Sequence, residues 1–295
     1  MGYVLVLVSS ANHQPLQQKH LETVSQYLGE QGSWQWLSVG KAAELSFARL
    51  PGHWTSEDLE GLLKEDGIDF FLVEPGARRK KKLLVCDMDN TVVVGETLDD
   101  LAESCGLGAE IAAITKRAMA GRIDFAEALK TRVRMLKDLE LSELEKIRAK
   151  IRYTPGAETL VRVMREKGAF CVLVSGGFAS FTSAVAEKLG FHAHHSNILK
   201  TKDDKLTGEV REPILDHQEK RALLQQYRDQ LRITREEILA VGDGANDLAM
   251  INAAGFGVGF HPKACLKKKA KHSIVHGDLS TLLYAQGYRD FPFYS

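Results

Sequence analysis

A chain of 295 residues has room for more than one domain. Its 39 basic and 39 acidic side chains balance, so no overall charge points to nucleic acid or an anionic membrane as a partner. A hydrophobic share of 44%, without any apolar run near the ~20 residues of a membrane span, is typical of a globular protein. The four cysteines lie far apart, which favours reduced thiols, and we therefore expect a cytoplasmic protein.

Residues 1–78 are predicted to form a small α+β domain of their own. The apolar pattern predicts strands at 3–9, 34–39, 45–50 and 68–73, and helices at 16–28 and 55–64. The resulting order, β-α-β-β-α-β, is typical of ferredoxin-like and ACT-like sandwiches. No candidate catalytic residues gather here, so we expect this segment to be regulatory or to mediate a homodimer.

A polar linker is predicted from residue 75 to residue 82. It ends in five consecutive cations, the run Arg-Arg-Lys-Lys-Lys at residues 78–82. Such a run could bind nucleic acid, but we expect a solvated hinge between two domains.

Two aspartates follow the next apolar run. Leu83–Cys86 is long enough for a strand buried on both faces, and Asp87 and Asp89 come directly after it. Alternation along an extended chain points both carboxylates to the same side of the strand end. Two like charges at that spacing repel each other, unless a divalent cation neutralises them or one of them serves as an acid.

Four helices are predicted next, beginning near Thr97, Ala109, Asp124 and Ser142 and forming a wholly helical insert. Strands and helices then alternate, which predicts a parallel sheet with right-handed crossovers. Two polar turns follow strands in that part of the chain, at residues 175–177 and 242–247. Because ligands bind outside the carboxyl ends of parallel strands, one pocket is expected to collect both turns and the aspartates.

The order of these motifs resembles the haloacid-dehalogenase-like hydrolases. The motifs are Asp87-Met88-Asp89-Asn90-Thr91, Ser175-Gly176-Gly177-Phe178, Lys220 and Gly242-Asp243-Gly244-Ala245-Asn246-Asp247. The run Ile114-Thr115-Lys116-Arg117-Ala118-Met119-Ala120-Gly121, with Arg132-Val133, is similar to the phosphoserine phosphatases of that superfamily. Asn90 departs from the pattern, since that family usually has serine there.

The resemblance implies a fold: a Rossmann-like parallel-sheet core over residues 79–295, with a helical cap inserted at about 96–153. It also implies an activity, the Mg²⁺-dependent hydrolysis of O-phospho-L-serine to L-serine and phosphate, the last step of serine biosynthesis. Asp87 would be the nucleophile that forms an aspartyl-phosphate, and Asp89 would be the general acid and base. Mg²⁺ would be held by Asp87, the backbone carbonyl of Asp89 and the side chain of Asp243.

The substrate phosphate is expected to meet Ser175 and Gly176, because hydroxyl and N–H groups at a helix N-terminus cradle anions. By resemblance, Lys220 and Asn246 would add further phosphate contacts. Asp247 would support the metal site or Lys220 from behind.

Arg132 is expected to face inward, because it falls within the apolar stripe of Phe125, Leu129 and Leu136 on its helix. An inward arginine needs an anion, and the substrate carboxylate would supply it. Glu96, at the mouth of the insert, would bind the substrate ammonium. An internal ion pair at Arg132 and a simple helix-start acid at Glu96 remain the structural alternatives.

Two other functions stay open. A related enzyme would act on another small phosphomonoester, such as phosphohomoserine. A chain without catalysis would be a regulatory or binding protein, although its complete set of acidic and basic site residues argues against this.

Overall fold

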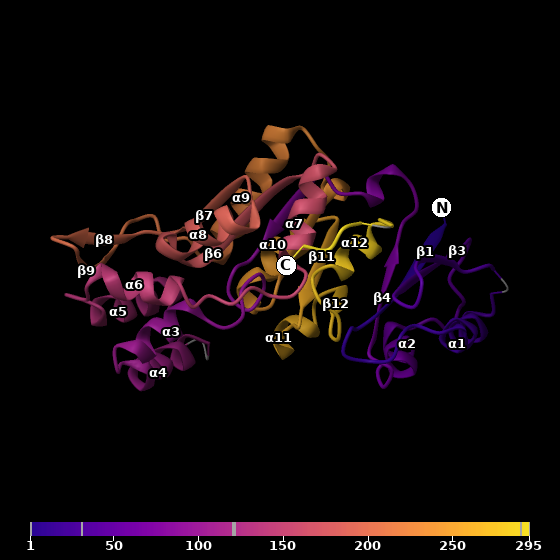
Figure 1. Cartoon of the computed structure of the whole chain (residues 1–295), viewed down its shortest axis with the longest axis horizontal. Coiled ribbons are helices and arrows are strands. Elements are labelled where there is room, and N and C mark those ends of the chain that lie inside the picture. The colour runs from indigo at the N-terminus through magenta and orange to yellow at the C-terminus, as the bar shows by residue number, and fades with distance from the viewer. Residues whose placement is uncertain (1, 31, 120–121, 290, 295) are drawn as a thin grey trace.

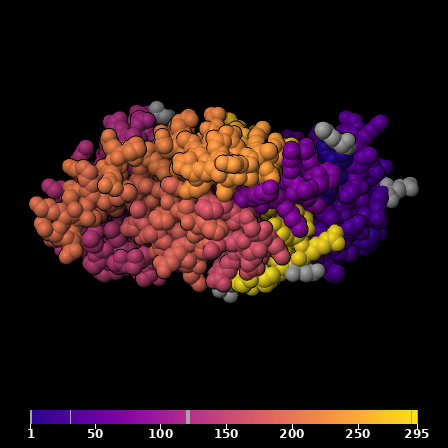
Figure 2. All heavy atoms as spheres, turned by 90° about the horizontal axis from the view of Figure 1, so that it is seen from above, coloured from indigo at the N-terminus to yellow at the C-terminus, as the bar shows by residue number. Residues whose placement is uncertain are grey.

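The computed structural model describes residues 2–30, 32–119, 122–289 and 291–294. Three parts follow one another along the long axis, namely an N-terminal sheet, a central sheet with helices on its faces, and a helical cap (Figure 1). Seen from above, the molecule is elongated, with the N-terminal sheet at one end and the cap at the other (Figure 2).

The N-terminal unit has the predicted order of elements. It comprises β1 (Tyr3–Ser9), α1 (Gln18–Leu28), β2 (Gln35–Ser38), β3 (Ala42–Phe47), α2 (Ser56–Leu63) and β4 (Ile68–Val73). The antiparallel sheet runs β2-β3-β1-β4, the arrangement expected of an ACT-like sandwich. The strand predicted at 45–50 was wrong in its bounds: Gly40, with a φ of 73°, makes a tight turn that lets β3 begin at Ala42.

Both faces of this sheet are buried, and alternation along β1 separates them. Leu5 and Leu7 pack against α1 and α2 in a cluster confined to the N-terminal unit. Val4, Val6 and Val8 instead belong to the large cluster that includes the central sheet. The sheet face that a two-layer sandwich would leave open is therefore covered by the rest of the chain.

The central sheet is parallel throughout and runs β12-β11-β10-β5-β6-β7. Its strands are β5 (Leu83–Cys86), β6 (Phe170–Phe178), β7 (Ala193–Asn197), β10 (Ile238–Gly242), β11 (Phe256–Phe260) and β12 (His272–Ile274). Its α-helices are α7 (Ala157–Glu166), α8 (Ala179–Leu189), α9 (His217–Leu231), α10 (Leu248–Ala253), α11 (Ala264–Lys267) and α12 (Thr281–Ala285). The elements after Ala254 had no counterpart in the sequence-based prediction, because they are short and weakly periodic.

The cap holds four helices, as predicted: α3 (Thr97–Ser104), α4 (Gly108–Met119), α5 (Phe125–Met135) and α6 (Leu141–Arg148). Asp124 caps α5 by accepting from two backbone N–H groups. Thr97 and Ser142 were predicted as the N-terminal capping residues of their helices, which was wrong. The residue before the first helical turn is Glu96 in α3 and Glu140 in α6. Residues 120 and 121, part of the motif used for the resemblance, lie outside the described residues.

The inserted segment is helical as predicted, but a hairpin from a later part of the chain also packs against it. A hairpin of β8 (Leu199–Lys202) and β9 (Lys205–Val210) reaches out from the central part and contacts α5 (Figure 1). Its turn at Asp203 and Asp204 has φ angles of 50° and 57°, the geometry of a tight hairpin. The Leu206 N–H donates to the Leu139 carbonyl at 2.9 Å, which ties the hairpin to the cap.

The cationic run at 78–82 was also misjudged, because it is not a solvated hinge. Arg79 forms an ion pair with Glu44 of the N-terminal sheet at 2.7 Å and donates to the Ala285 carbonyl at 2.9 Å. Lys81 donates to two backbone carbonyls, and Lys82 pairs with Glu237 at 2.7 Å. Arg79 therefore connects the N-terminal unit to the central part, whereas Lys82 pairs within the central part. The division at residue 78 stays a prediction.

Among the described residues, no helix combines the length and the apolar character that crossing a membrane requires.

Candidate active site

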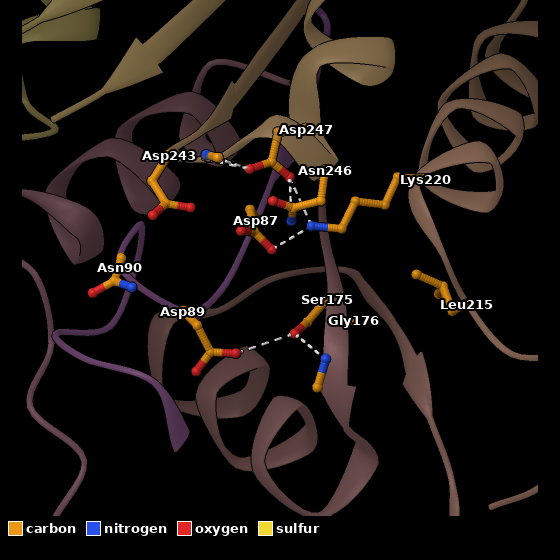
Figure 3. Close-up of polar contacts among 12 residues, drawn as sticks. Asp87, Asp89, Asn90, Ser175, Gly176, Leu215, Lys220, Asp243, Asn246 and Asp247 are labelled. Carbon is orange, nitrogen blue, oxygen red and sulfur yellow. Dashed lines mark hydrogen bonds and ion pairs between the residues drawn. The ribbon is translucent and has the colours of Figure 1, made fainter. Parts of the chain in front are cut away.

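Three neighbouring strands bring the predicted polar turns to one edge of the sheet. β5 pairs in parallel with β10 on one side and with β6 on the other. Asp87 follows β5, Asp243 follows β10, and Ser175 lies near the end of β6, so the three side chains meet at the carboxyl ends of the strands (Figure 3). All three are at least 95% buried, since Asp87 and Asp243 are 4% exposed and Ser175 is 1% exposed.

Lys220 joins two carboxylates at the centre of this edge. Its Nζ lies 2.6 Å from Asp87 Oδ1 and 2.7 Å from Asp247 Oδ1 (Figure 3). Burial lowers the pKa of Lys220, but the two nearby carboxylates raise it by more than burial lowers it. The net pKa shift is upward, so the ammonium keeps its charge. The ion pairs hold the Lys220 side chain in an orientation that points into the site.

Asp247 has no free oxygen among the described contacts. Oδ1 accepts from Lys220 and from Asn246 Nδ2, and Oδ2 accepts from the N–H groups of Asp243 and Gly244, both at 3.1 Å. A carboxylate occupied in this way organises its neighbours. It thus matches the supporting role expected for Asp247.

The site offers hard oxygen donors for a cation. Carboxylate oxygens of Asp87, Asp243 and Asp247 all lie within 4.8 Å of one another. Burial, reinforced by the Asp247 charge, raises the pKa of Asp87 well above its usual value despite Lys220, a sign that negative charge is under-compensated. Both oxygens of Asp247 are occupied, whereas Asp87 and Asp243 each pair with a lysine through one oxygen and keep the other available for a metal. The donor set therefore fits a hard divalent cation such as Mg²⁺.

Asp89 lies beside Ser175 but in a different electrostatic environment. Its Oδ2 is 3.5 Å from Ser175 Oγ, and its Oδ1 accepts from the Thr97 N–H at 2.9 Å (Figure 3). Burial, together with the nearby Glu96 charge, raises the pKa of Asp89 to about 7. Two carboxyl groups two residues apart thus differ in their partners: Asp87 is paired with a lysine, whereas Asp89 has a hydroxyl and a backbone N–H as partners and a pKa of about 7.

The turn at 175–177 differs from the expected strand-to-helix turn. β6 continues to Phe178 with an irregular register after Val174, and α8 begins only at Ala179. The Gly177 N–H donates to Ser175 Oγ at 2.9 Å, and a Cβ on Gly177 would come within 3.2 Å of Asp89 Oδ2. Small residues here let the backbone approach Asp89 closely, as an anion cradle requires.

Two predicted substrate residues, Arg132 in α5 and Glu96 just before α3, belong to the cap. Arg132 faces inward as expected, and its Nη1 donates to Thr115 Oγ1 at 3.3 Å rather than to a carboxylate. Burial lowers the pKa of Arg132, while Asp99 and Glu96 raise it without overcoming that effect. An inward guanidinium without an ion pair among the described residues is available for an anionic ligand.

Of the other predicted residues, Asn246 is exposed and contacts Asp247, and Gly176 is half-buried. Sequence reasoning missed two residues. Asn197 donates to the Gly176 carbonyl at 2.9 Å and so fixes the turn, and Lys263 lies 2.9 Å from Asp243 Oδ2. Neither sits in a recognisable motif. The one signal in the chain was that Lys263 lies three residues after a strand that pairs with β10.

Comparison with known proteins agrees with this geometry. Residues 84–252 match the family described as haloacid dehalogenase-like hydrolase. That match covers more than half of the chain and includes all three strand ends of the site. The chain belongs to the haloacid dehalogenase-like hydrolase family.

A narrower group stands out among its relatives. A phosphoserine phosphatase of Archaeoglobus fulgidus is 43% identical over 201 residues, which is 68% of this chain and 58% of that protein. The chain thus spans little more than half the length of the first curated relatives it matches.

Two solved structures match nearly the whole chain, including the N-terminal unit. The crystal structure of a HAD family hydrolase from Salmonella enterica serovar Typhi has a TM-score of 0.86 at 25% identity, covering 96% of this chain and 98% of that one. An unliganded probable phosphoserine phosphatase from Vibrio cholerae has a TM-score of 0.79 at 29% identity, covering 99% and 90%.

Proposed function

We propose that this protein is a phosphoserine phosphatase that hydrolyses O-phospho-L-serine with the help of Mg²⁺. The observation that carries the proposal is the arrangement of Asp87, Asp89 and Lys220 at the strand ends, together with a cap guanidinium, Arg132, that has no ion pair among the described residues. The names of the relatives from Archaeoglobus fulgidus and Vibrio cholerae support the choice of substrate. The proposed place in metabolism is the last step of serine biosynthesis.

Asp87 is the proposed nucleophile. One of its oxygens attacks phosphorus, the bond from phosphorus to the serine oxygen breaks, and an aspartyl-phosphate forms; water then attacks that phosphorus and frees Asp87. Lys220 holds Asp87 at 2.6 Å and offsets part of the negative charge that meets the phosphate. Mg²⁺, when bound by Asp87, Asp243 and the Asp89 carbonyl, supplies charge neutralisation at the transferring phosphoryl group.

Asp89 is the proposed acid and base. It gives a proton to the departing serine oxygen and takes one from the attacking water in the second step. A pKa near 7 suits both directions of transfer, and the Ser175 hydroxyl and Thr97 N–H fix its orientation.

The remaining proposed contacts bind the three charged groups of the substrate, namely its phosphate, carboxylate and ammonium. Ser175, Gly176, Lys220 and Asn246 would bind the phosphate at the strand ends. Arg132 would grip the carboxylate and Glu96 the ammonium, both from the cap, whose closure over the core would exclude water.

The same site would accept phosphohomoserine, which carries the same three groups with one more methylene. Phosphate release should be measured from O-phospho-L-serine, phosphohomoserine and phosphoethanolamine, with and without Mg²⁺. We expect phosphoserine to give the highest kcat/KM and chelation of the metal to abolish turnover. A preference for phosphoethanolamine, which lacks the carboxylate, would contradict the role given to Arg132.

Asp87→Asn tests the nucleophile. We expect kcat to fall by about 10⁴-fold or more, because an amide cannot form the phosphoenzyme. Turnover that survives in a folded Asp87→Asn protein would overturn the mechanism.

We also propose that residues 1–78 form a domain that mediates a homodimer, and that the protein acts in the cytoplasm. All four cysteines are free, which suits a reducing compartment. Since Val4, Val6 and Val8 are covered by the central part, the dimer would have to use another surface of the N-terminal unit, such as the edge strand β2. Light scattering of the purified chain tests the dimer, and a monomer at micromolar concentration would contradict it.

A further inference from the structure

We propose that Lys263 and Asn90 form a latch that holds Glu96 ready to bind the substrate ammonium, and so determine selectivity for amino-acid phosphates. The inference rests on the proposed function and extends it to two positioning residues. Nothing in the motifs that define the site assigns a role to either of them.

Both latch residues contact the same oxygen of Glu96. Asn90 Nδ2 donates to Glu96 Oε1 at 2.7 Å, and Lys263 Nζ lies 3.3 Å from that atom. No hydrogen bond or ion pair to Glu96 Oε2 is found among the described residues. The latch therefore fixes the carboxylate through one oxygen and leaves the other free for a cationic ligand.

Lys263 is itself held by the core. Its backbone N–H donates to the Asp243 carbonyl at 2.9 Å, and its Nζ lies 2.9 Å from Asp243 Oδ2. Lys263 thus links the metal-site loop after β10 to the first residue before the cap.

The backbone at Asn90 explains why asparagine stands there. Its φ is 53°, in the left-handed region that asparagine tolerates better than most residues. Its amide is both a donor and long enough to reach Glu96 across six residues of chain. Serine, expected there in the related enzymes, has a shorter side chain and would leave Lys263 as the sole partner of Oε1.

Fixing Glu96 matters because its side chain is 44% exposed and would otherwise sample several rotamers. A carboxylate that is already oriented loses less conformational entropy when the ligand binds. The advantage applies only to substrates that carry an ammonium, and the latch is therefore a selectivity device and not a general aid to phosphoryl transfer.

The test compares two substrates in one protein. O-phospho-L-serine carries the ammonium, and 3-phosphooxypropionate is the same ester with hydrogen in its place. Loss of the contact with Asp243 can lower turnover of both esters alike, so the readout is the ratio of kcat/KM for phosphoserine to kcat/KM for the desamino ester. For Lys263→Met, we expect that ratio to fall about tenfold, chiefly through a higher KM for phosphoserine. The matched control is Lys267→Met, because Lys267 is similarly exposed and pairs with Glu60 of the N-terminal unit, away from the site.

The Glu96→Gln background separates the latch from an effect through Asp243. There we expect Lys263→Met to have no further effect on the ratio of kcat/KM for the two esters. Equal losses on both esters, or a full effect in the Glu96→Gln background, would overturn the latch. Wild-type protein that turns over other phosphomonoesters but not phosphoserine would refute the proposed function instead.

Asn90→Ser provides an independent check. We expect it to raise KM for phosphoserine by a smaller factor, because Lys263 still holds Oε1. The double variant Asn90→Ser, Lys263→Met should lose more than either single variant. An Asn90→Ser protein with unchanged selectivity between the two esters would remove Asn90 from the latch.

Discussion

Two of the regions in which the described residues bury carboxylates treat these groups in opposite ways. At the strand ends Asp87, Asp243 and Asp247 crowd within 4.8 Å and share two lysines as partners. At the contact between the N-terminal sheet and the central part, Asp69 stands alone. It accepts from the backbone N–H groups of residues 275, 276 and 277 at distances between 2.7 and 3.3 Å.

The difference lies in what each carboxylate can exchange. Burial raises the pKa of Asp69 while its three backbone donors lower it, and those donors are fixed by the chain. The partners at the strand ends are side-chain ammonium groups, beside which a metal ion or a phosphate can bind. A buried carboxylate whose partners are backbone N–H groups stabilises an interface. A cluster of buried carboxylates with too few cationic partners is suited to bind a further cation.

Removing Lys220 should have the largest effect on this contrast. Lys220→Met leaves Asp87 and Asp247 buried without their shared cation, and we expect a loss of about 3–5 kcal/mol in the free energy of unfolding. Phosphatase activity should fall by about 10³-fold or more. Denaturant unfolding and phosphate release measure the two effects, and Lys220→Arg is the control that keeps the charge. A stable, active Lys220→Met protein would show that the carboxylate cluster does not depend on the positive charge of Lys220.

Removing the Asp69 carboxylate should lower the free energy of unfolding without lowering the catalytic rate. Asp69→Ala strands three backbone N–H groups in the interface, for which we expect a loss of about 3 kcal/mol. We expect kcat of the folded protein to stay within about twofold of wild type, since Asp69 lies outside the catalytic edge. A large fall in kcat, with normal unfolding, would mean that the interface controls the site.

Acid should weaken the same interface through His272. This ring lies between Phe71 and Phe256, and burial lowers its pKa to about 3, so it is neutral in the folded protein. The unfolded chain binds a proton near pH 6.5, so stability is full above that pH and is lost as the pH falls toward 3.

The expected contribution of His272 between pH 7 and pH 5 is about 2 kcal/mol. His272→Leu should therefore lose less stability over that range than wild type does. Urea unfolding at the two pH values measures this, and identical pH dependence in both proteins would exclude the histidine.

An exposed ion pair gives the smallest expected effect. Lys82 pairs with Glu237, but the lysine side chain is 64% exposed. Lys82→Gln should change the free energy of unfolding by less than about 0.5 kcal/mol, because solvent screens the pair. A loss comparable to that of Asp69→Ala would mean that exposure does not separate the two classes of contact.

Sequence reasoning performed best where local chemistry decides the outcome. The β-α-β-β-α-β order, the cap at Asp124 and the strand before Asp87 follow from periodicity and capping. Parallel alternation of strands and helices then predicts Asp87, Ser175 and Asp243 at one edge of the sheet. It failed where boundaries depend on distant partners, as at β3 and in the turn at 175–177.

What the amino-acid sequence determined by itself is therefore the class of the core, the pair of aspartates after β5 and the inward arginine of the cap. These depend on residue type and spacing within single elements. Only the tertiary structure decided that Arg79 of the cationic run connects the N-terminal unit to the central part. The same holds for the contact of Lys263 with Glu96, which is 167 residues away in the sequence. Contacts between residues so distant leave no periodic trace in the chain, because their geometry is set by how whole elements pack.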